Sequence, residues 1–292
     1  MYVADVHCRL INKGGQCITN RSIHLKPYTM KMVRPKKSLG QHFLKDQGIA
    51  RMIVEALPLT TPDVLEIGPG TGVLTQYLTE LKEINLKLIE IDRDSVAFLK
   101  KNRPAWEKII IEGDFLEIEM PKIFPGKFSI IGNFPYNISS QIFFKALKHR
   151  DQVEHIVCML QLEVAERIAS PHGNKTYGIL SVLLQAYYDI KLLFKVPPHV
   201  FNPPPKVTSG VIRLDRNSRT VLGCSETLFV QVVKQGFNTR RKTLRNALKN
   251  LNLATEISAL PLMDKRAEQL SVEDFIQLTL LIEKSRAAIG GI

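Results

Sequence analysis

Short apolar segments alternate with amphipathic segments between residues 46 and 161, and few folds are compatible with this alternation. The apolar runs resemble buried strands, and the segments between them carry apolar residues at helical spacing. The predicted strands cover residues 63–68, 86–92, 108–114, 127–133 and 154–161. The predicted helices cover residues 46–57, 72–82, 95–102 and 139–149. Strands that alternate with helices predict an α/β fold with a parallel, doubly wound sheet.

The pattern changes after the polar segment at residues 214–220. The later segments have helical periodicity and no strand signal, and they cover residues 226–237, 240–250, 256–261 and 272–284. We therefore expect a domain boundary near Arg216, with one domain over residues 33–216 and a small all-helical domain over residues 217–292. Residues 1–32 show no periodicity, and we interpret them as a disordered extension or a mis-assigned start.

The positive charge of the chain lies in two blocks. The formal net charge is +12, and residues 1–45 carry nine Lys or Arg against one Asp. Residues 234–250 carry six Lys or Arg and no acid, so the rest of the chain is slightly acidic. Two concentrated blocks favour a polyanionic partner such as nucleic acid, although a basic face that is simply solvated stays the alternative.

Cysteine spacing and hydropathy exclude several classes of protein. No apolar stretch approaches the roughly 18 residues that a membrane helix needs, so we expect no membrane span. The four cysteines lie far apart, without zinc-site spacing, at Cys8, Cys17, Cys158 and Cys224. We therefore expect no metal site and a protein of the reducing cytoplasm, and we take it to be a monomer.

Glycines and polar residues follow four predicted strands at the point where each strand ends. Residues 66–72, EIGPGTG, let the backbone turn tightly and admit a ligand, and they differ from the dinucleotide pattern G-x-G-x-x-G. Glu90 can accept both hydroxyls of a ribose, and Asp114 can accept an adenine amino group. Each feature alone also fits a tight turn, a helix cap or a solvated loop. Together with Asn133 they predict an adenosine site, for which S-adenosylmethionine is the most economical cofactor.

The fourth predicted strand leads directly into Asn133, Phe134, Pro135 and Tyr136, the predicted catalytic residues. The Asn133 side-chain oxygen and the Phe134 carbonyl can accept both hydrogens of an exocyclic amine and aim its nitrogen at a methyl donor. Pro135 has no N–H and a fixed φ, which makes this arrangement rigid. Tyr136 offers a face on which a flipped-out base can stack. A proline turn beside a core aromatic is the structural alternative.

The chain resembles the ribosomal RNA adenine dimethyltransferase family from about residue 34 to the C-terminal helices. The resemblance rests on KSLGQHFL (37–44), EIGPGTG (66–72), EID (90–92), GD (113–114), NFPY (133–136), FNPPPKVTS (201–209) and FNTRRKTLRN (237–246). It implies a Rossmann-like, S-adenosylmethionine-dependent methyltransferase sheet with a small all-helical RNA-binding domain after it. It also implies two methyl transfers to N6 of each of two adjacent adenosines, in a hairpin loop near the 3′ end of 16S rRNA.

The resemblance further implies which residues bind the cofactor and the RNA. By position, the cofactor contacts would be His42, Leu44, Gly68, Glu90, Asp114 and Asn133. The family usually has Asn where this chain has His42, so a buried structural role for this side chain is the alternative. Phe201 would be the second wall of the base slot, with a core aromatic as the alternative.

The two basic blocks supply the expected contacts with the small-subunit rRNA. These contacts are Arg34, Lys36 and Lys37 in the first block, and Arg240, Arg241, Lys242, Arg245 and Lys249 in the second. Arg241, Arg245 and Lys249 are spaced at i, i+4 and i+8, which predicts one face of a helix. Beside a site that methylates adenine, we interpret this face as a phosphate contact.

Two other functions are compatible with parts of the sequence. One is an adenine dimethyltransferase of large-subunit rRNA, and the helical segment with residues 237–246 argues against it. The other is a non-catalytic RNA-binding or transcription-associated factor with the same fold, and the intact motif at residues 133–136 argues against that. A small-molecule methyltransferase would leave the two basic blocks unexplained.

Overall fold

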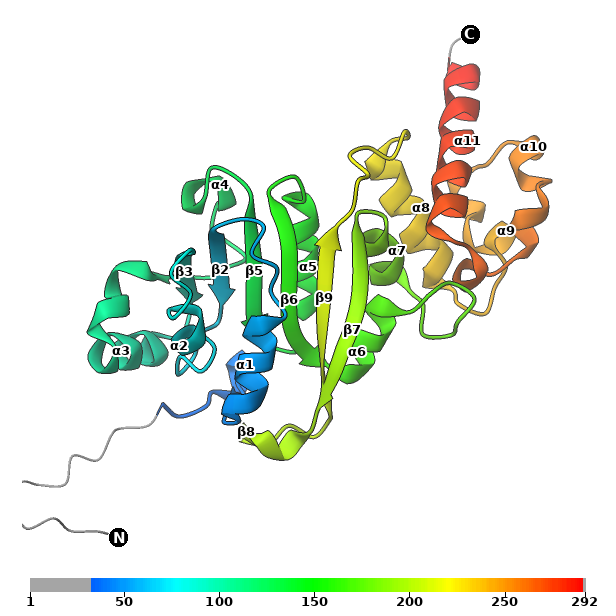
Figure 1. Ribbon diagram of the computed structural model, residues 1–292. Coiled ribbons are helices and arrows are strands. Elements are labelled where there is room, and N and C mark those ends of the chain that lie inside the picture. Colours follow the sequence, from blue (N-terminus) through cyan, green and yellow to red (C-terminus); the bar gives the residue numbers. More distant parts are fainter. Residues whose placement is uncertain (1–32, 291–292) are drawn as a thin grey trace, which may run out of the picture. The chain divides into compact units, whose positions relative to one another are not determined.

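The computed structural model describes residues 33–290, so the predicted extension over residues 1–32 lies outside the described residues (Figure 1). A seven-stranded sheet has the order β4-β3-β2-β5-β6-β9-β7. Its strands are β2 (Asp63–Ile67), β3 (Asn85–Glu90), β4 (Ile110–Glu112), β5 (Phe128–Asn133), β6 (Val153–Gln161), β7 (Tyr188–Val196) and β9 (Ser209–Arg216). A separate ribbon pairs β1 (Phe43–Leu44) with β8 (Phe201–Asn202) in antiparallel register.

The sheet is mixed, and the parallel arrangement predicted from the sequence holds for β2 to β6. Strand β9 lies antiparallel to both of its neighbours, β6 and β7. The segment between β7 and β9 contains no crossover helix, so the chain returns beside β7 in the opposite direction. The five strands that the sequence predicts are thus parallel as expected, and the structure adds β7 and β9, which the sequence did not predict.

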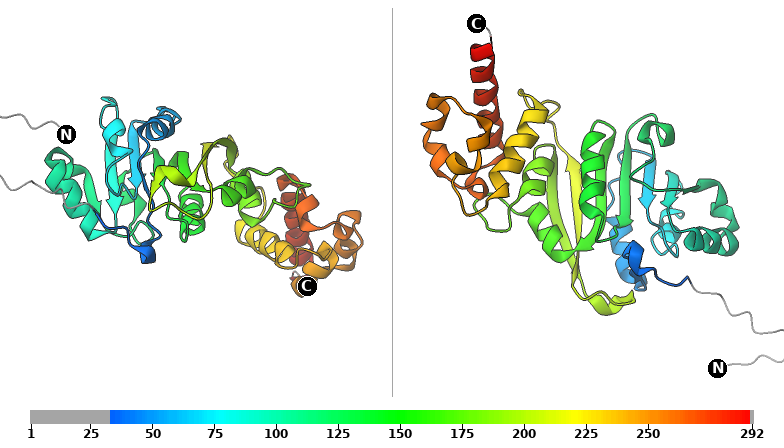
Figure 2. Two further views of the ribbon diagram at one scale, coloured as in Figure 1. Left: turned by 90° about the horizontal axis from the view of Figure 1, so that it is seen from below. Right: turned by 180° about the vertical axis from the view of Figure 1, so that it is seen from behind.

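Helices cover both faces of the sheet, as Figures 1 and 2 show. In β6, Ile156 and Cys158 belong to one hydrophobic cluster, and Val157 and Met159 belong to the other. This alternation places the two clusters on opposite faces. Helix α5 contributes to the first cluster and α1 to the second. The helices of this part are α1 (Gln47–Glu55), α2 (Thr75–Leu78), α3 (Arg93–Asn102), α4 (Met120–Ile123), α5 (Ser139–Lys148), α6 (Leu162–Ala169) and α7 (Ile179–Gln185).

Local sequence explains where some of these helices begin and end. Asp46 caps α1, because its side chain accepts a hydrogen bond of 3.0 Å from the Ile49 N–H. Asp92 caps α3 in the same way. The helix predicted over residues 72–82 is much shorter, since its α-helical part is α2 alone. Short 3-10 helices cover Lys37–Leu39, Pro104–Ile109, Pro198–Val200, Lys249–Leu251, Pro261–Asp264 and Ala267–Gln269.

The last part of the described chain is helical, with α8 (Glu226–Asn238), α9 (Leu244–Ala247), α10 (Thr255–Ser258) and α11 (Val272–Gly290). The helix predicted over residues 240–250 is interrupted, because α9 is followed by a 3-10 turn that ends at Asn252 with a left-handed φ of 50°. Arg241, Arg245 and Lys249 therefore do not share one continuous helix face. This part of the sequence prediction was wrong.

The helices after Arg216 share a hydrophobic core with the preceding residues. Phe237 of α8 packs between Tyr177 and Phe275, with ring centroids 6.0 and 5.9 Å away. The cluster that holds these rings also includes Val182 of α7. The domain boundary near Arg216 stays a prediction.

Candidate active site

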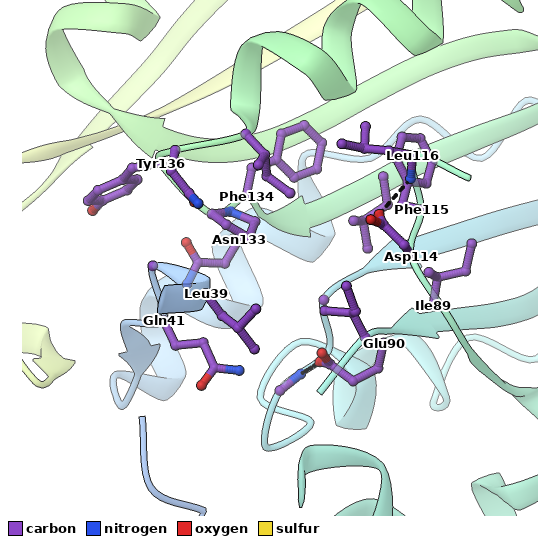
Figure 3. A pocket seen from close by; sticks show the side chains of 18 of the residues that line it. Leu39, Gln41, Ile89, Glu90, Asp114, Phe115, Leu116, Asn133, Phe134 and Tyr136 are labelled. Atoms are coloured by element: carbon purple, nitrogen blue, oxygen red, sulfur yellow. Dashed lines mark hydrogen bonds between the residues drawn. The ribbon is translucent and has the colours of Figure 1, made fainter. Parts of the chain in front are cut away.

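One pocket lies where four neighbouring strands end, and Figure 3 shows the side chains that line it. Strands β2, β3, β4 and β5 are parallel neighbours, so their carboxyl ends meet at one edge of the sheet. Gly68 follows β2, Glu90 ends β3, Asp114 follows β4 and Asn133 ends β5. All four residues line the pocket. The structure thus brings together the four positions that the sequence singled out.

The glycine turn leaves space for a ligand at one position. Gly68, Gly70 and Gly72 have φ values of 66°, 56° and 83°, a region that favours glycine. A Cβ on Gly70 would lie 2.9 Å from the Phe43 ring, and one on Gly72 would lie 2.7 Å from the Trp106 ring. A Cβ on Gly68 would meet nothing within 4 Å. Gly68 therefore borders open space, while Gly70 and Gly72 permit close packing.

Glu90 is a buried carboxylate that is held at both of its oxygens. Its side chain accepts hydrogen bonds of 2.9 Å from the backbone N–H groups of Gly70 and Asp92, and the residue is 4% exposed. Burial raises the pKa of Glu90, while these two hydrogen bonds act in the opposite direction. Each carboxylate oxygen has a further lone pair, so Glu90 can accept from a ligand without releasing the turn.

Asp114 lies in the loop that follows β4. Its Oδ1 accepts a hydrogen bond of 2.8 Å from the Leu116 N–H, which fixes the orientation of the carboxylate. Phe115 and Leu116 of the same loop also line the pocket. The second carboxylate oxygen of Asp114 makes no hydrogen bond to the described residues, so it can accept one from a ligand.

Asn133 and Phe134 present acceptors to the pocket. Asn133 Nδ2 donates to the His42 carbonyl at 2.9 Å, which leaves its side-chain oxygen as the free acceptor. The Phe134 side chain is 1% exposed and packs against Phe143, so the polar atoms that Phe134 can offer are those of its backbone. Its N–H donates to the Met159 carbonyl at 2.9 Å, and its carbonyl is the group that stays available.

Tyr136 is held from two sides. Its hydroxyl lies 2.6 Å from Ser209 Oγ, and its ring is stacked with the His42 imidazole. His42 Nδ1 lies 2.8 Å from the Pro203 carbonyl oxygen. The His42 side chain thus contacts Tyr136 and Pro203, and its backbone carbonyl contacts Asn133. The contact with Asn133 uses the backbone carbonyl of residue 42, which every residue type has, so it does not require Asn at this position.

Two of the residues expected to contact the cofactor or the target base do not line this pocket. Leu44 and Phe201 are neighbours across the small β1–β8 ribbon, and they are 5% and 1% exposed. Both belong to the hydrophobic cluster on the α1 face of the sheet. For Phe201, the structure corresponds to the alternative of a core aromatic.

The segment before β1 closes one side of the pocket, and the sequence did not single out its contacts. Gln41 Nε2 donates to Asp92 Oδ2 at 3.0 Å, and Lys36 Nζ donates to Asp92 Oδ1 at 2.5 Å. Although burial opposes ionisation of Asp92, these hydrogen bonds lower its pKa. Leu39 and Gln41 line the pocket. Their position in the KSLGQHFL motif indicated a role near the site. The hydrogen bond from Gln41 to Asp92 has no local sequence signal, because the two residues are 51 positions apart.

The basic side chains expected to contact RNA differ in whether they already have a partner within the protein. Lys36 pairs with Asp92, and Arg240 donates to the carbonyls of Lys175 and Tyr177. Arg245 pairs with Asp264 at 2.7 Å and also donates to the Ser258 carbonyl. The other five are exposed and make no ion pair with any described residue, namely Arg34, Lys37, Arg241, Lys242 and Lys249.

No group of three or more His, Cys, Asp or Glu side chains in residues 33–290 is arranged to hold a metal ion. Within the same residues, each helix is too short or too polar to cross a bilayer.

The strand order and the pocket define a Rossmann-like methyltransferase. A model of the family described as ribosomal RNA adenine dimethylase matches residues 32–284, and the chain therefore belongs to this family. This result confirms the resemblance seen in the sequence, and with it the class of enzyme.

Individual proteins agree with this assignment. A relative from Cytophaga hutchinsonii named ribosomal RNA small subunit methyltransferase A is 57% identical over 87% of this chain and 99% of its own length. A solved dimethyladenosine transferase from Plasmodium falciparum has a TM-score of 0.70 and 28% identity, over 84% of this chain and 98% of that one. A solved 23S rRNA methyltransferase, ErmE, has a TM-score of 0.60 and 23% identity over 81% and 99% of the two chains, which supports the fold alone.

Proposed function

We propose that this protein uses S-adenosylmethionine to dimethylate N6 of two adjacent adenosines in the 3′-terminal hairpin loop of 16S rRNA. The observation that carries the proposal is the 2.9 Å hydrogen bond from Asn133 Nδ2 to the His42 carbonyl. It orients the amide so that its oxygen is the acceptor beside the Phe134 backbone. This chain matches 99% of the length of the Cytophaga hutchinsonii relative, and the name of that relative supports the small subunit as the substrate.

The pocket has the acceptors and the open space that an adenosine-containing methyl donor requires. Glu90 would accept the ribose hydroxyls, and the free oxygen of Asp114 would accept the adenine amino group. The open side of Gly68 leaves room for the rest of the cofactor. When bound, S-adenosylmethionine supplies an electrophilic methyl group on its sulfonium.

Residues 133–136 would handle the target base. An exocyclic amine of a purine is a poor nucleophile, because its lone pair is delocalised into the ring. The Asn133 oxygen and the Phe134 carbonyl would accept both of its hydrogens and hold the nitrogen in line with the methyl group. Tyr136 would stack on the base, with its ring plane set by Ser209 and His42. A dedicated general base is unnecessary, since the amine proton becomes acidic once the nitrogen is alkylated.

The free basic side chains would contact rRNA phosphates. This role suits the exposed group Arg34, Lys37, Arg241, Lys242 and Lys249 better than Lys36, Arg240 and Arg245, whose side chains have protein partners. An RNA hairpin loop suits the site, because its unstacked bases can be turned into a pocket. We place this activity in the cytoplasm, carried out by a monomer whose residues 217–292 form the RNA-binding domain.

Methyl transfer to undermethylated small ribosomal subunits tests the proposal. Labelled S-adenosylmethionine should give labelled dimethyladenosine with the wild-type protein, and none should form on large subunits. Asn133→Ala serves as the control, since it removes the amide that would hold the amine, and it should form far less product. Product on large subunits alone would favour the large-subunit enzyme. No product on either particle would favour a non-catalytic RNA-binding factor.

A further inference from the structure

The side chain of Lys145, on α5, is bound entirely to the loop that carries Asp114. Its ammonium group donates to the carbonyls of Phe115 at 2.5 Å and Leu116 at 2.9 Å, and also to that of Ile118. A lysine has three N–H donors, so all of them are used by this loop. The ammonium also lies 5.2 Å from the centroid of the Phe115 ring, within the range of a cation–π contact.

This loop forms the wall of the pocket around the proposed adenine position. Asp114, Phe115 and Leu116 all line the pocket. The loop is short, and its internal hydrogen bonds join Asp114 to the N–H groups of Leu116, Glu117 and Ile118. Three further carbonyls of the loop accept from the Lys145 ammonium on a neighbouring helix. The position of the Asp114 carboxylate therefore depends on contacts within the loop and on the contacts with Lys145.

Helix α5 begins directly after the residues that handle the target base. Ser139, its first residue, donates to the Tyr136 carbonyl at 3.3 Å. Helix α5 packs its buried face into the core through Ile142, Phe143 and Ala146. Lys145 thus belongs to a helix whose first residue is bonded to the base-handling motif. The ammonium group of Lys145 holds the loop that carries Asp114.

We propose that Lys145 is a positioning residue for cofactor binding, which sets the Asp114 carboxylate at the distance at which it recognises the adenine amino group. The proposal rests on the proposed use of an adenosine-containing cofactor. Lys145 does not line the cofactor pocket, and it acts through the loop. Burial lowers the pKa of Lys145, while the nearby carboxylates of Glu117 and Asp114 act in the opposite direction and favour its charged form.

The test compares two ligands that differ at the group Asp114 would recognise. S-adenosylhomocysteine carries the adenine amino group, and S-inosylhomocysteine carries a carbonyl oxygen there, which a carboxylate repels. Wild-type protein should prefer the adenine ligand by at least about tenfold in calorimetry. Lys145→Met should reduce this preference by at least about fivefold. With saturating cofactor, its kcat and its KM for the ribosomal subunit should stay within about twofold of the wild-type values.

Lys148→Met is the matched control, because Lys148 is exposed and lies one turn further along α5. It should leave the ligand preference unchanged. The proposal is overturned if Lys145→Met keeps the wild-type preference, or if cofactor affinity, kcat and subunit binding all fall together as for a general loss of structure. If wild-type protein binds neither ligand, the proposed cofactor is wrong instead, so the two failures are distinguishable.

A second measurement covers the case in which Lys145→Met does not fold. Lys145→Arg keeps the charge but changes the geometry of its donors. We expect faster amide hydrogen exchange at residues 115–118 in this variant, with unchanged exchange in β5 and β6. The Leu116 N–H, which bonds to Asp114, is the most direct reporter. Wild-type exchange at residues 115–118 would overturn the proposal.

Discussion

The His42 imidazole is stacked on the Tyr136 ring, with ring centroids 5.5 Å apart and planes inclined by 27°. His42 lies directly before β1 and Tyr136 lies in the loop after β5, 94 positions away, and each has a further anchor. Tyr136 is bonded to Ser209, and His42 contacts the Pro203 carbonyl. The plane of the ring proposed to stack on the target base is therefore fixed before any base arrives.

We expect His42→Ala to slow methyl transfer without weakening cofactor binding. The stacking contact is worth about 0.5–1.5 kcal/mol, which corresponds to a rate decrease of about 2- to 12-fold. The backbone carbonyl that holds Asn133 remains in the variant. Single-turnover transfer and calorimetry measure the two effects, and His42→Phe should retain most of the rate. Weaker cofactor binding with an unchanged rate would instead support the prediction that His42, which lines the pocket, contacts the cofactor.

Asn133→Ala should lower methyl transfer strongly and cofactor affinity more modestly. The first methyl group replaces one amine hydrogen, so the second transfer has one donor fewer with which to hold the nitrogen. The variant should therefore accumulate monomethyladenosine, which nucleoside analysis of the rRNA detects.

Tyr136→Ala should lose stacking of about 1–3 kcal/mol with near-normal cofactor affinity. Dimethyladenosine formed at the parent rate by both variants would refute the catalytic assignment.

Glu90→Gln should weaken cofactor binding at least about tenfold, since it removes a charge-assisted hydrogen bond of about 1.5–3 kcal/mol. It should also lower thermal stability, because the new amide group faces the Gly70 N–H or the Asp92 N–H as a second donor. Affinity for rRNA should hold. Glu112→Gln, an exposed carboxylate on the adjacent strand, is the control. Calorimetry that shows full affinity for Glu90→Gln would contradict the ribose assignment.

Glu66 predicts a pH dependence of stability. Burial raises the pKa of Glu66 from 4.5 to about 8, against a hydrogen bond from Thr75 that lowers it. The unfolded chain releases this proton near its usual pKa, and the folded chain holds it to higher pH. The contribution of Glu66 to stability therefore falls as pH rises between these two values, at up to about 1.4 kcal/mol per pH unit.

Glu66→Gln should remove this loss, because the amide cannot ionise and its oxygen can still accept from Thr75. Denaturant unfolding at pH 6 and pH 9 measures the effect. The variant should already be the more stable protein at pH 6, because this pH lies above the usual pKa of 4.5, and its advantage should be larger at pH 9. Parallel stability curves for the two proteins would show that Glu66 is already ionised at pH 6.

Arg241 and Arg245 should differ in their effect on RNA binding. Arg241 makes no hydrogen bond or ion pair with the described residues, whereas Arg245 is bound to Asp264 and the Ser258 carbonyl. Arg241→Ala should reduce the salt dependence of rRNA binding by about one unit, and Arg245→Ala should leave it nearly unchanged. Binding measured over a series of salt concentrations checks both. If the slope of rRNA affinity against salt concentration is the same for Arg241→Ala and the wild type, Arg241 is simply solvated and does not contact a phosphate.

The sequence alone was sufficient to locate the site along the chain. Gly68, Glu90, Asp114 and Asn133 each lie at or near the end of a predicted strand, and parallel strands end at one edge of a sheet, so their meeting could be inferred from the sequence. Four of the seven segments that carry the family resemblance contain these residues. Local backbone geometry constrains the glycines, and the proposed ligand would constrain the polar residues, so both would leave a pattern in neighbouring positions.

Other features depended on contacts between segments that are far apart. Neither the burial of Phe201 nor the pairing of Arg245 with Asp264 has a local signal, and the same holds for the ammonium of Lys145 beneath the Asp114 loop. The antiparallel β9 likewise follows from the path of the chain after β7. Sequence by itself determined the class of fold, the order of the site residues and their chemistry. The tertiary structure decided which of these polar groups are free for a ligand. Whether a donor or a charged group already has a protein partner depends on its neighbours in space, as for Arg245 and Asp264.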